Sequence, residues 1–375
     1  MISHGKGVIS GAEFAPSVFI NNGYLMFFAS DNWAGAHEAI AQRLLSASTG
    51  FAAAYGNSDL DQKVEARFSE VFEREVAVFF VATGTAANSL SLASVQRPGG
   101  ITFCHSEAHV IEDECGAPEF FSNSARLVAV SGEAGKIDPA QLSAKIAGYP
   151  EDAVHHGRAS AVTITQATEI GTVYSLPEIG EISSIARKRG LPLHMDGARF
   201  ANALVALGAT PAEMTWKRGV DILSFGGTKN GCWCAEAIVF FNPDQAKEMP
   251  FIRKRAAQLF SKSRFIAAQF DAYFEEELWL GLARHSNGMA DHLRAGIGAS
   301  NSARLAWPTA SNEVFAVITK NAAKVAESRG AKFYEWPVPV ATPELVGDNE
   351  TLIRLVTSFA TTEADVDGFL KCLAA

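Results

Sequence analysis

Short apolar runs alternate with amphipathic stretches between about residues 45 and 270. The apolar runs have the length of buried strands and lie at residues 75–82, 101–105, 125–130, 160–165, 191–196, 220–225 and 236–241. Helical spacing follows the first run at residues 86–95 and recurs at 175–190, where a proline stands near the start and a glycine at the end. This alternation predicts an α/β fold with a largely parallel sheet, whose functional groups gather beyond the carboxyl ends of the strands.

The pattern changes after the last of these runs. Residues 249–285 read as a long helical segment, and further strands are expected at 312–319, 331–336 and 352–361, with a closing helix at 362–375. We therefore expect an N-terminal segment at 1–44, a large domain at 45–270 and a smaller C-terminal α+β domain at 271–375.

Composition narrows the class of protein. Hydrophobic residues make up 48% of the chain, which is enough for sizeable cores. The formal net charge of -9 argues against a nucleic-acid binder, which would carry a basic face. Five cysteines are an odd number and do not form a disulfide framework. No apolar run is long enough for a membrane span and no ordered signal peptide is visible, so we expect a soluble, cytoplasmic protein.

Two charged residues follow predicted strands at the edge where ligands bind. Asp196 ends the run "LPLHMD", with Arg199 in the first turn of the next helix. Lys229 stands in the glycine-rich loop "SFGGTKNG" after the next run. Taken alone, Asp196 and Arg199 suit a local ion pair, and a loop lysine is commonly solvated. Their positions at two successive strand ends make a shared site the alternative.

Gly84 and Thr85 follow the strand at residues 75–82 and open a helix. Free N–H groups at a helix start favour an anion such as phosphate. An ordinary threonine N-cap is the alternative explanation for the same residues.

Histidines and cysteines offer further candidates. His155 and His156 stand before the run at 160–165 and are candidates for a general base, or are simply exposed loop residues. A metal site from Cys104, His105, His109 and Cys115 is conceivable, but their spacing matches no common zinc motif.

The combination is more specific than its parts. A pyridine cofactor with an aldehyde and a phosphate tail needs an amine for a Schiff base, a carboxylate for the ring nitrogen and N–H groups for the phosphate. Lys229, Asp196 and the Gly84–Thr85 turn supply these three groups in the expected order along the chain.

At this point the chain resembles the fold-type I pyridoxal phosphate enzymes, and among them the low-specificity L-threonine aldolases and L-phenylserine aldolases. The matching segments are "ASDN", "YGNSD", "VATGTAANSLSL", "SEAHVIEDECGAP", "LHMDGARFANA", "SFGGTKNG" and "LIRLVTSFATT". They run from the N-terminal segment to beyond Arg354, so the resemblance covers nearly the whole chain. It implies a fold-type I architecture, a mostly parallel sheet in a large domain with a smaller C-terminal domain.

The resemblance also implies how the cofactor is held. Lys229 would carry the Schiff base, Asp196 would pair with the pyridinium nitrogen, and His109 would stack on the ring. Gly84 and Thr85 would hold the phosphate. Arg264 would reach the phosphate from a partner subunit, since the resemblance implies a homodimer or homotetramer with shared active sites.

For the substrate, the resemblance implies that Ser30, Arg199 and Arg354 bind the α-carboxylate. His155 would accept the proton of the β-hydroxyl group, with His156 as the rival position. The expected reaction is retro-aldol cleavage of an L-β-hydroxy-α-amino acid to glycine and an aldehyde.

The sequence departs from the common family pattern in "ATEIG" and in "NGCWCAEA", and both departures look like the phenylserine-aldolase branch. The alternatives are another pyridoxal phosphate lyase, such as a β-eliminating enzyme, and a catalytically idle homologue.

Overall fold

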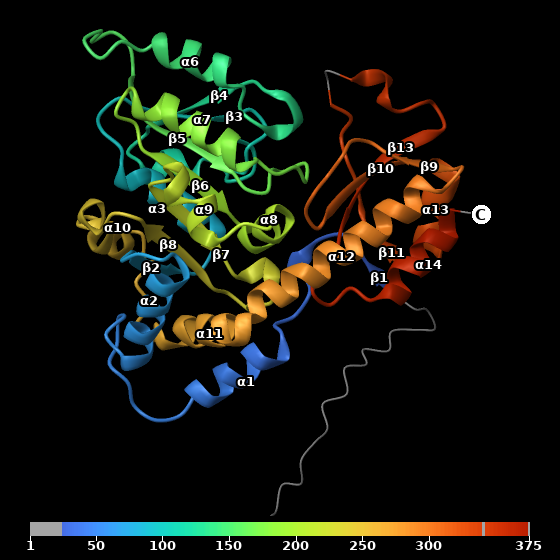
Figure 1. Ribbon diagram of the computed structural model, residues 1–375, viewed down its shortest axis with the longest axis horizontal. Coiled ribbons are helices and arrows are strands. Elements are labelled where there is room, and N and C mark those ends of the chain that lie inside the picture. Colours follow the sequence, from blue (N-terminus) through green and yellow to red (C-terminus); the bar gives the residue numbers. More distant parts are fainter. Residues whose placement is uncertain (1–24, 340–341, 374–375) are drawn as a thin grey trace, which may run out of the picture.

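The computed structural model describes residues 25–339 and 342–373. The large domain is built on a seven-stranded sheet in the order β2-β8-β7-β6-β5-β3-β4 (Figure 1). The strands are β2 (Ala77–Val81), β3 (Gly100–His105), β4 (Arg126–Val130), β5 (Arg158–Thr165), β6 (Leu193–Gly197), β7 (Ile222–Gly226) and β8 (Glu236–Phe240). Every apolar run predicted as a strand in this part of the chain lies in this sheet. The predicted fold class, α/β with a fold-type I architecture, is confirmed.

All pairs from β4 to β7 are parallel, whereas β8 runs antiparallel to both β7 and β2. The exception has a simple cause. Residues 227–235 connect β7 directly to β8 without a long helical crossover, and parallel neighbours need such a crossover. The start of β8 therefore lies beside the ends of β7 and β2.

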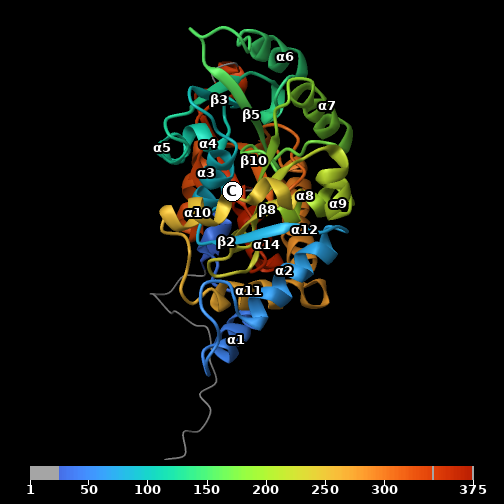
Figure 2. The same cartoon turned by 90° about the vertical axis from the view of Figure 1, so that its left-hand side faces the viewer.

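Helices cover both faces of the sheet. In Figure 2, α3 (Gly84–Ser94), α4 (His109–Glu112), α5 (Ala117–Phe121) and α10 (Met249–Arg255) lie on one side, and α7 (Leu176–Arg187), α8 (Phe200–Leu207) and α9 (Pro211–Met214) lie on the other. The helix α6 (Pro139–Ala147) packs against α7, and α1 (Glu38–Ala47) and α2 (Asp59–Val71) pack against α11 (Arg264–Phe274). The α2–α11 contact is rich in aromatic side chains, with Phe68 and Phe274 only 4.9 Å apart between ring centroids.

The segment at 249–285 is not one helix. It divides into α10, α11 and the long α12 (Leu278–Gly298). One break falls at Ala257 and the other at Glu276 and Glu277, all of which have a positive φ. L-residues enter this left-handed region at a cost, so tertiary packing must override the helical preference of glutamate here.

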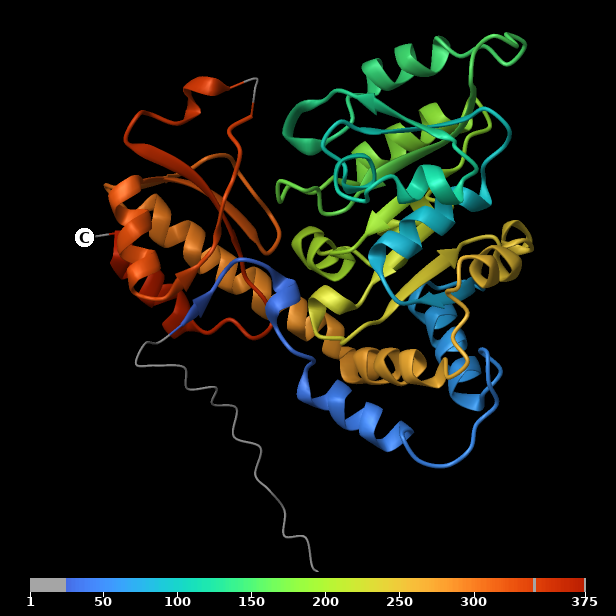
Figure 3. The same cartoon turned by 180° about the vertical axis from the view of Figure 1, so that it is seen from behind.

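The smaller domain contains an antiparallel sheet in the order β12-β13-β10-β9. Its strands are β9 (Ala303–Leu305), β10 (Glu313–Thr319), β12 (Tyr334–Glu335) and β13 (Glu350–Val356), and its helices are α13 (Lys320–Ser328) and α14 (Glu363–Leu373). Near the N-terminus, β1 (Met26–Phe27) pairs with β11 (Ala331–Lys332), so this segment packs with the C-terminal part of the chain (Figure 3). The domain boundaries at 44/45 and 270/271 stay predictions.

The helix α12 joins two hydrophobic cores. Trp279 and Ala283 belong to the core of the large domain, and Ala290, Leu293 and Ile297 belong to the core of the smaller domain. Across residues 25–339 and 342–373, no helix combines the length and the apolar character that a bilayer span requires.

Candidate active site

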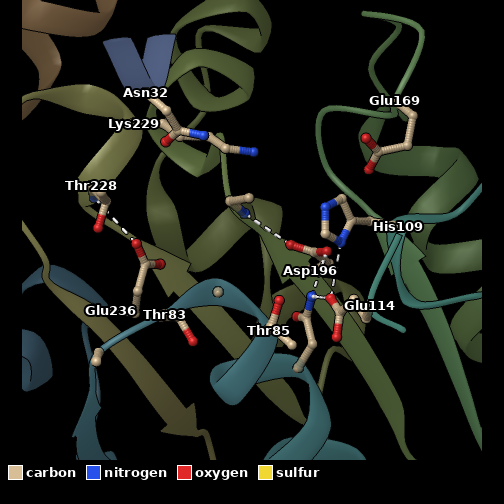
Figure 4. Close-up of a pocket in the computed structure, with 14 residues that line it drawn as sticks. Asn32, Thr83, Thr85, His109, Glu114, Glu169, Asp196, Thr228, Lys229 and Glu236 are labelled. Atoms are coloured by element: carbon tan, nitrogen blue, oxygen red, sulfur yellow. Dashed lines mark hydrogen bonds and ion pairs between the residues drawn. The ribbon is translucent and has the colours of Figure 1, made fainter. Parts of the chain in front are cut away.

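A cavity of about 280 Å³ lies at the carboxyl ends of the parallel strands. Its walls come from seven parts of the chain. These are the segment at Asn32, the start of α3, the region around α4, the loops after β5, β6 and β7, and the start of β8. The charged and hydroxyl-bearing side chains that line it are Thr83, Thr85, His109, Glu114, Glu169, Asp196, Thr228, Lys229 and Glu236 (Figure 4).

Asp196 lies in β6, almost fully buried at 2% exposure. Its Oδ1 accepts a hydrogen bond from the Ala198 amide at 3.0 Å, and its Oδ2 accepts one from Asn88 Nδ2 at 2.8 Å. Neither partner is a cation. The carboxylate is therefore held in a fixed position while its negative charge is left uncompensated by its hydrogen-bond partners.

Lys229 follows β7 in a short 3-10 turn, Thr228–Asn230. Its ammonium group points into the cavity (Figure 4). Among the described residues, no carboxylate lies within ion-pair distance of this lysine, so its amine faces the open space.

The start of α3 forms one end of the cavity. Thr83 caps the helix by accepting a hydrogen bond from the Ala86 amide at 3.1 Å, and the Ala87 amide bonds the Thr83 carbonyl. The amides of Gly84 and Thr85 belong to the first turn, where intrahelical partners do not exist. A Cβ built on Gly84 would meet nothing within 4 Å. The free amides and the open space beside them therefore form a suitable binding site for an anion.

His109 lines the opposite wall and is oriented by Glu114. Its Nδ1 lies 3.0 Å from Glu114 Oε1, and Asn88 Nδ2 donates to the same carboxylate oxygen at 2.8 Å. The hydrogen bond to Glu114 raises the pKa of His109. Asn88 thus connects the carboxylate that orients the imidazole to Asp196.

Three glutamates that line the cavity, Glu114, Glu169 and Glu236, were not predicted from the sequence. Burial raises the pKa of Glu169, in the loop after β5, to about 7, and burial likewise raises the pKa of Glu236, at the start of β8, to about 7. The sequence does contain a signal for Glu169 and Glu236. Each is an acidic residue next to the end of an apolar strand, where solvation is poor.

The residues expected to bind the substrate carboxylate gather beside the cavity rather than in its wall. Asp31 accepts two hydrogen bonds from Arg199, from Nε at 2.7 Å and from Nη2 at 3.1 Å. Ser30 caps the turn that carries Asp31. Arg354 Nη2 approaches the Ala29 carbonyl at 3.4 Å, and its guanidinium lies 4.6 Å from the centroid of the Trp336 ring. All three predicted residues therefore meet the segment 29–31, next to Asn32.

Arg199 is already engaged within the chain. Burial alone would lower its pKa, but Asp31 and Glu313 outweigh this and raise it. Glu313 Oε1 lies 3.4 Å from Arg199 Nη1, and neither oxygen of this fully buried carboxyl has a hydrogen-bond partner among the described residues.

His155 and His156 are not brought to the cavity within one chain. Both are exposed and precede β5, whereas the cavity lies beyond the other end of that strand. The eight residues of β5 separate the two sites by roughly 23 Å. The role of His155, or of its rival His156, as the base stays a prediction, and strand direction places both at the edge of the sheet opposite to the cavity of their own chain.

Arg264 also lies outside the cavity in its own chain, where its Nη1 donates to the Gly50 carbonyl at 3.2 Å. The conceivable metal set does not assemble either, because Cys104 is buried and Cys115 is exposed. In the described part of the chain, no three His, Cys, Asp or Glu side chains are placed to hold a metal ion.

In this cavity a lysine, a buried carboxylate and the start of a helix meet at the carboxyl edge of an α/β sheet. This combination is typical of pyridoxal phosphate-dependent enzymes. Comparison with known proteins gives the same class and narrows it. Residues 28–338 match the family described as Beta-eliminating lyase. A low specificity L-threonine aldolase of Pseudomonas aeruginosa is 42% identical over 307 residues, 82% of this chain and 88% of that protein.

A second low specificity L-threonine aldolase, from a Pseudomonas species, matches to the same extent, with 42% identity over 307 residues. The structure of the Leishmania major threonine aldolase superposes with a TM-score of 0.85 at 27% identity, covering 93% of this chain and 98% of that one. The chain therefore belongs to the beta-eliminating lyase family of pyridoxal phosphate-dependent enzymes, and its predicted resemblance to the threonine aldolases is confirmed.

Proposed function

We propose that this protein is a pyridoxal phosphate-dependent lyase that cleaves L-β-hydroxy-α-amino acids, of the L-threonine, L-allo-threonine and L-phenylserine type, to glycine and an aldehyde. The observation that carries the proposal is the convergence of Lys229, Asp196 and the start of α3 on one cavity. The 42% identity to relatives named low specificity L-threonine aldolases supports the reaction type.

The residues present fit the cofactor. Lys229 would provide the amine that attaches it, and the amides of Gly84 and Thr85 would hold its phosphate, since a helix start favours an anion. Asp196 would keep a proton on the ring nitrogen, because its carboxylate has no cation among its hydrogen-bond partners. His109 would lie against the ring, and Glu114 orients its imidazole. When bound, pyridoxal phosphate supplies an electron sink for the pair left as the Cα–Cβ bond breaks.

The β-hydroxyl proton needs an acceptor, and Glu169 is the cavity group best suited to it. A base is most effective when its pKa lies near the working pH, and burial gives Glu169 a pKa of about 7. The Thr168 amide bonds the Thr172 carbonyl at 2.9 Å, and their hydroxyl oxygens lie 2.8 Å apart, so the loop that carries Glu169 is rigidly closed. His155 or His156 keeps this role only as a residue supplied by a second copy of the chain.

Substrate binding uses the neighbouring charged segment. Ser30 and the planar guanidinium groups of Arg199 and Arg354 suit an α-carboxylate. Asp31 holds Arg199 in one orientation by two hydrogen bonds, and Arg199 Nη1 lies 3.4 Å from Glu313 Oε1.

We also infer a cytoplasmic homodimer or homotetramer with shared active sites. In that assembly Arg264 reaches the phosphate of the neighbouring subunit.

The visible absorption spectrum of the purified protein, before and after addition of glycine, tests the proposal. A cofactor band that partly shifts to longer wavelength with glycine is expected. A band indifferent to glycine contradicts the aldolase assignment. Absence of any band after incubation with pyridoxal phosphate contradicts the cofactor and favours an idle homologue.

β-Elimination is the second candidate, because the family that matches is described as a beta-eliminating lyase. Product analysis separates the two. An aldolase releases glycine and an aldehyde from L-threonine, whereas an eliminating enzyme releases ammonia and a keto acid.

A further inference from the structure

Glu236 carries a buried carboxyl group. It lies at the end of the cavity where the free amides at the start of α3 can donate hydrogen bonds to an anion. The sheet register pairs Glu236 with Val81 on one side and with Gly226 on the other. Val81 leads within three residues to Gly84, and Gly226 leads within three residues to Lys229. Glu236 therefore lies between the helix start and the lysine loop. In Figure 4 it lies near Thr83 and Thr228, away from Glu169 and His109.

The chain offers Glu236 little that would keep it charged. Glu236 is only 6% exposed, its Oε1 accepts a hydrogen bond from the Thr228 amide at 3.3 Å, and the Thr228 side chain also favours its ionised form. The charged groups that face it are Lys229, which favours its ionised form, and Asp196, which opposes it. Cys232 and Tyr273 also feel its charge, but burial raises the pKa of both well above the usual range, so both are neutral. No arginine or second lysine lines this cavity in the described part of the chain.

An anion at the start of α3 would therefore share its site with a carboxylate, and two like charges at close range disfavour each other. The conflict disappears when the carboxyl carries a proton, because the acid then becomes a hydrogen-bond donor. This inference rests on the proposed function, since the anion in question is the phosphate of the cofactor.

We propose that Glu236 is a protonated phosphate-binding residue, so that the phosphate ester of the cofactor binds together with one proton. In the free protein burial already raises the pKa of Glu236 to about 7. Below that pH the proton is present before binding. Above it the proton must be taken up, so the affinity falls by up to about tenfold for each pH unit.

Calorimetric binding of pyridoxine 5'-phosphate to the apoprotein tests this directly. The probe has the phosphate but no aldehyde, so it leaves the Lys229 amine free. At pH 8 a group with a pKa of about 7 is about 90% ionised, and the probe phosphate, with a second pKa of about 6, is already a dianion. Binding measured in two buffers of different ionisation enthalpy should show an uptake of about 0.9 proton by the wild-type protein.

Glu236→Gln should abolish most of this uptake and make the affinity nearly independent of pH between 7 and 9. The matched control is Glu169→Gln, which neutralises the other cavity carboxyl with a pKa of about 7 and should keep the proton uptake. Pyridoxine without phosphate should show no Glu236-dependent uptake in any variant.

The outcomes separate this inference from the function itself. Equal proton uptake by the wild-type protein and Glu236→Gln overturns the protonated-carboxyl assignment and leaves the cofactor proposal standing. Stronger binding by Glu236→Gln at every pH, without a change in proton uptake, also overturns it, because Glu236 would then be an ionised partner of Lys229. Failure of the wild-type protein to bind either the probe or pyridoxal phosphate overturns both proposals.

Discussion

Two groups of buried charges lie side by side in this molecule, and they differ in whether the chain neutralises them. In the first, which we call the junction cluster (Asp31, Arg199, Asn312 and Glu313), Asp31 accepts hydrogen bonds from Arg199 and Asn312. Burial would raise the pKa of Asp31, but Arg199 and Lys229 lower it below the ordinary range. Asp31 and Arg199 therefore neutralise each other before any ligand arrives, although the carboxyl of Glu313 has no hydrogen-bond partner among the described residues.

The cavity shows the opposite condition. Glu169 and Glu236 each have a pKa raised to about 7 by burial, and no cation pairs with either at ion-pair distance among the described residues. Lys229 faces open space. The difference teaches that burial alone does not mark a functional charge. A buried charge whose partner lies in the chain stabilises the fold, whereas one that faces a cavity without a partner is available for a ligand or a proton.

Lys229→Ala should have the largest effect, because Lys229 is the only lysine among the described residues that line the cavity. We expect complete loss of the visible cofactor band and of turnover, with the fold retained, as checked by absorbance, product assay and circular dichroism. A variant that remains coloured and active would remove the central assignment.

Glu169→Gln tests whether a raised pKa in the cavity serves the reaction. We expect turnover to fall by about 100-fold or more. In the wild-type protein kcat/KM should rise with pH through about 7, since the base of the free protein must lose its proton, and this limb should vanish in the variant. His155→Ala is the comparison variant. If it slows cleavage as much while Glu169→Gln does not, the base comes from a second copy of the chain.

Asp31→Asn tests the junction cluster. It leaves the buried Arg199 guanidinium with only the more distant Glu313, so we expect the free energy of unfolding to fall by about 3 kcal/mol or more. Urea unfolding of the apoprotein measures this without any contribution from the cofactor. A change below about 1 kcal/mol would mean that the cluster does not hold the fold together.

Arg304→Ala should have the smallest effect and serves as the control for Asp31→Asn. Arg304 and Glu350 form an exposed pair, worth less than about 1 kcal/mol, and turnover should not change. The hydrogen bond from Arg304 lowers the pKa of Glu350 to about 2. The contribution of this ion pair to the free energy of unfolding is therefore present at neutral pH. It is lost as the pH falls from the ordinary carboxyl range toward 2. An equally large loss at neutral and at acid pH would contradict this.

Much of the fold could be predicted from the sequence because buried parallel strands are continuous apolar runs. The direction of β8 could not, since an apolar run does not encode its partner's orientation. The break at Glu276 and Glu277 also carries no local signal, because neither residue is a typical left-handed residue.

For the site, Lys229, Asp196, Gly84, Thr85 and His109 were predicted together, and all line one cavity. Strand ends made this possible, since each of these residues lies near the carboxyl edge of the sheet. The same rule, applied to His155, would have shown that a residue before β5 lies at the far edge. The roles of all these residues stay predictions until the variants above are measured.

The long helix α12 has a consequence for how the molecule comes apart. Its first turns are buried in one hydrophobic core and its last turns in the other, so neither core can open without exposing apolar surface of the shared helix. The two domains should therefore unfold in a single cooperative transition rather than one after the other.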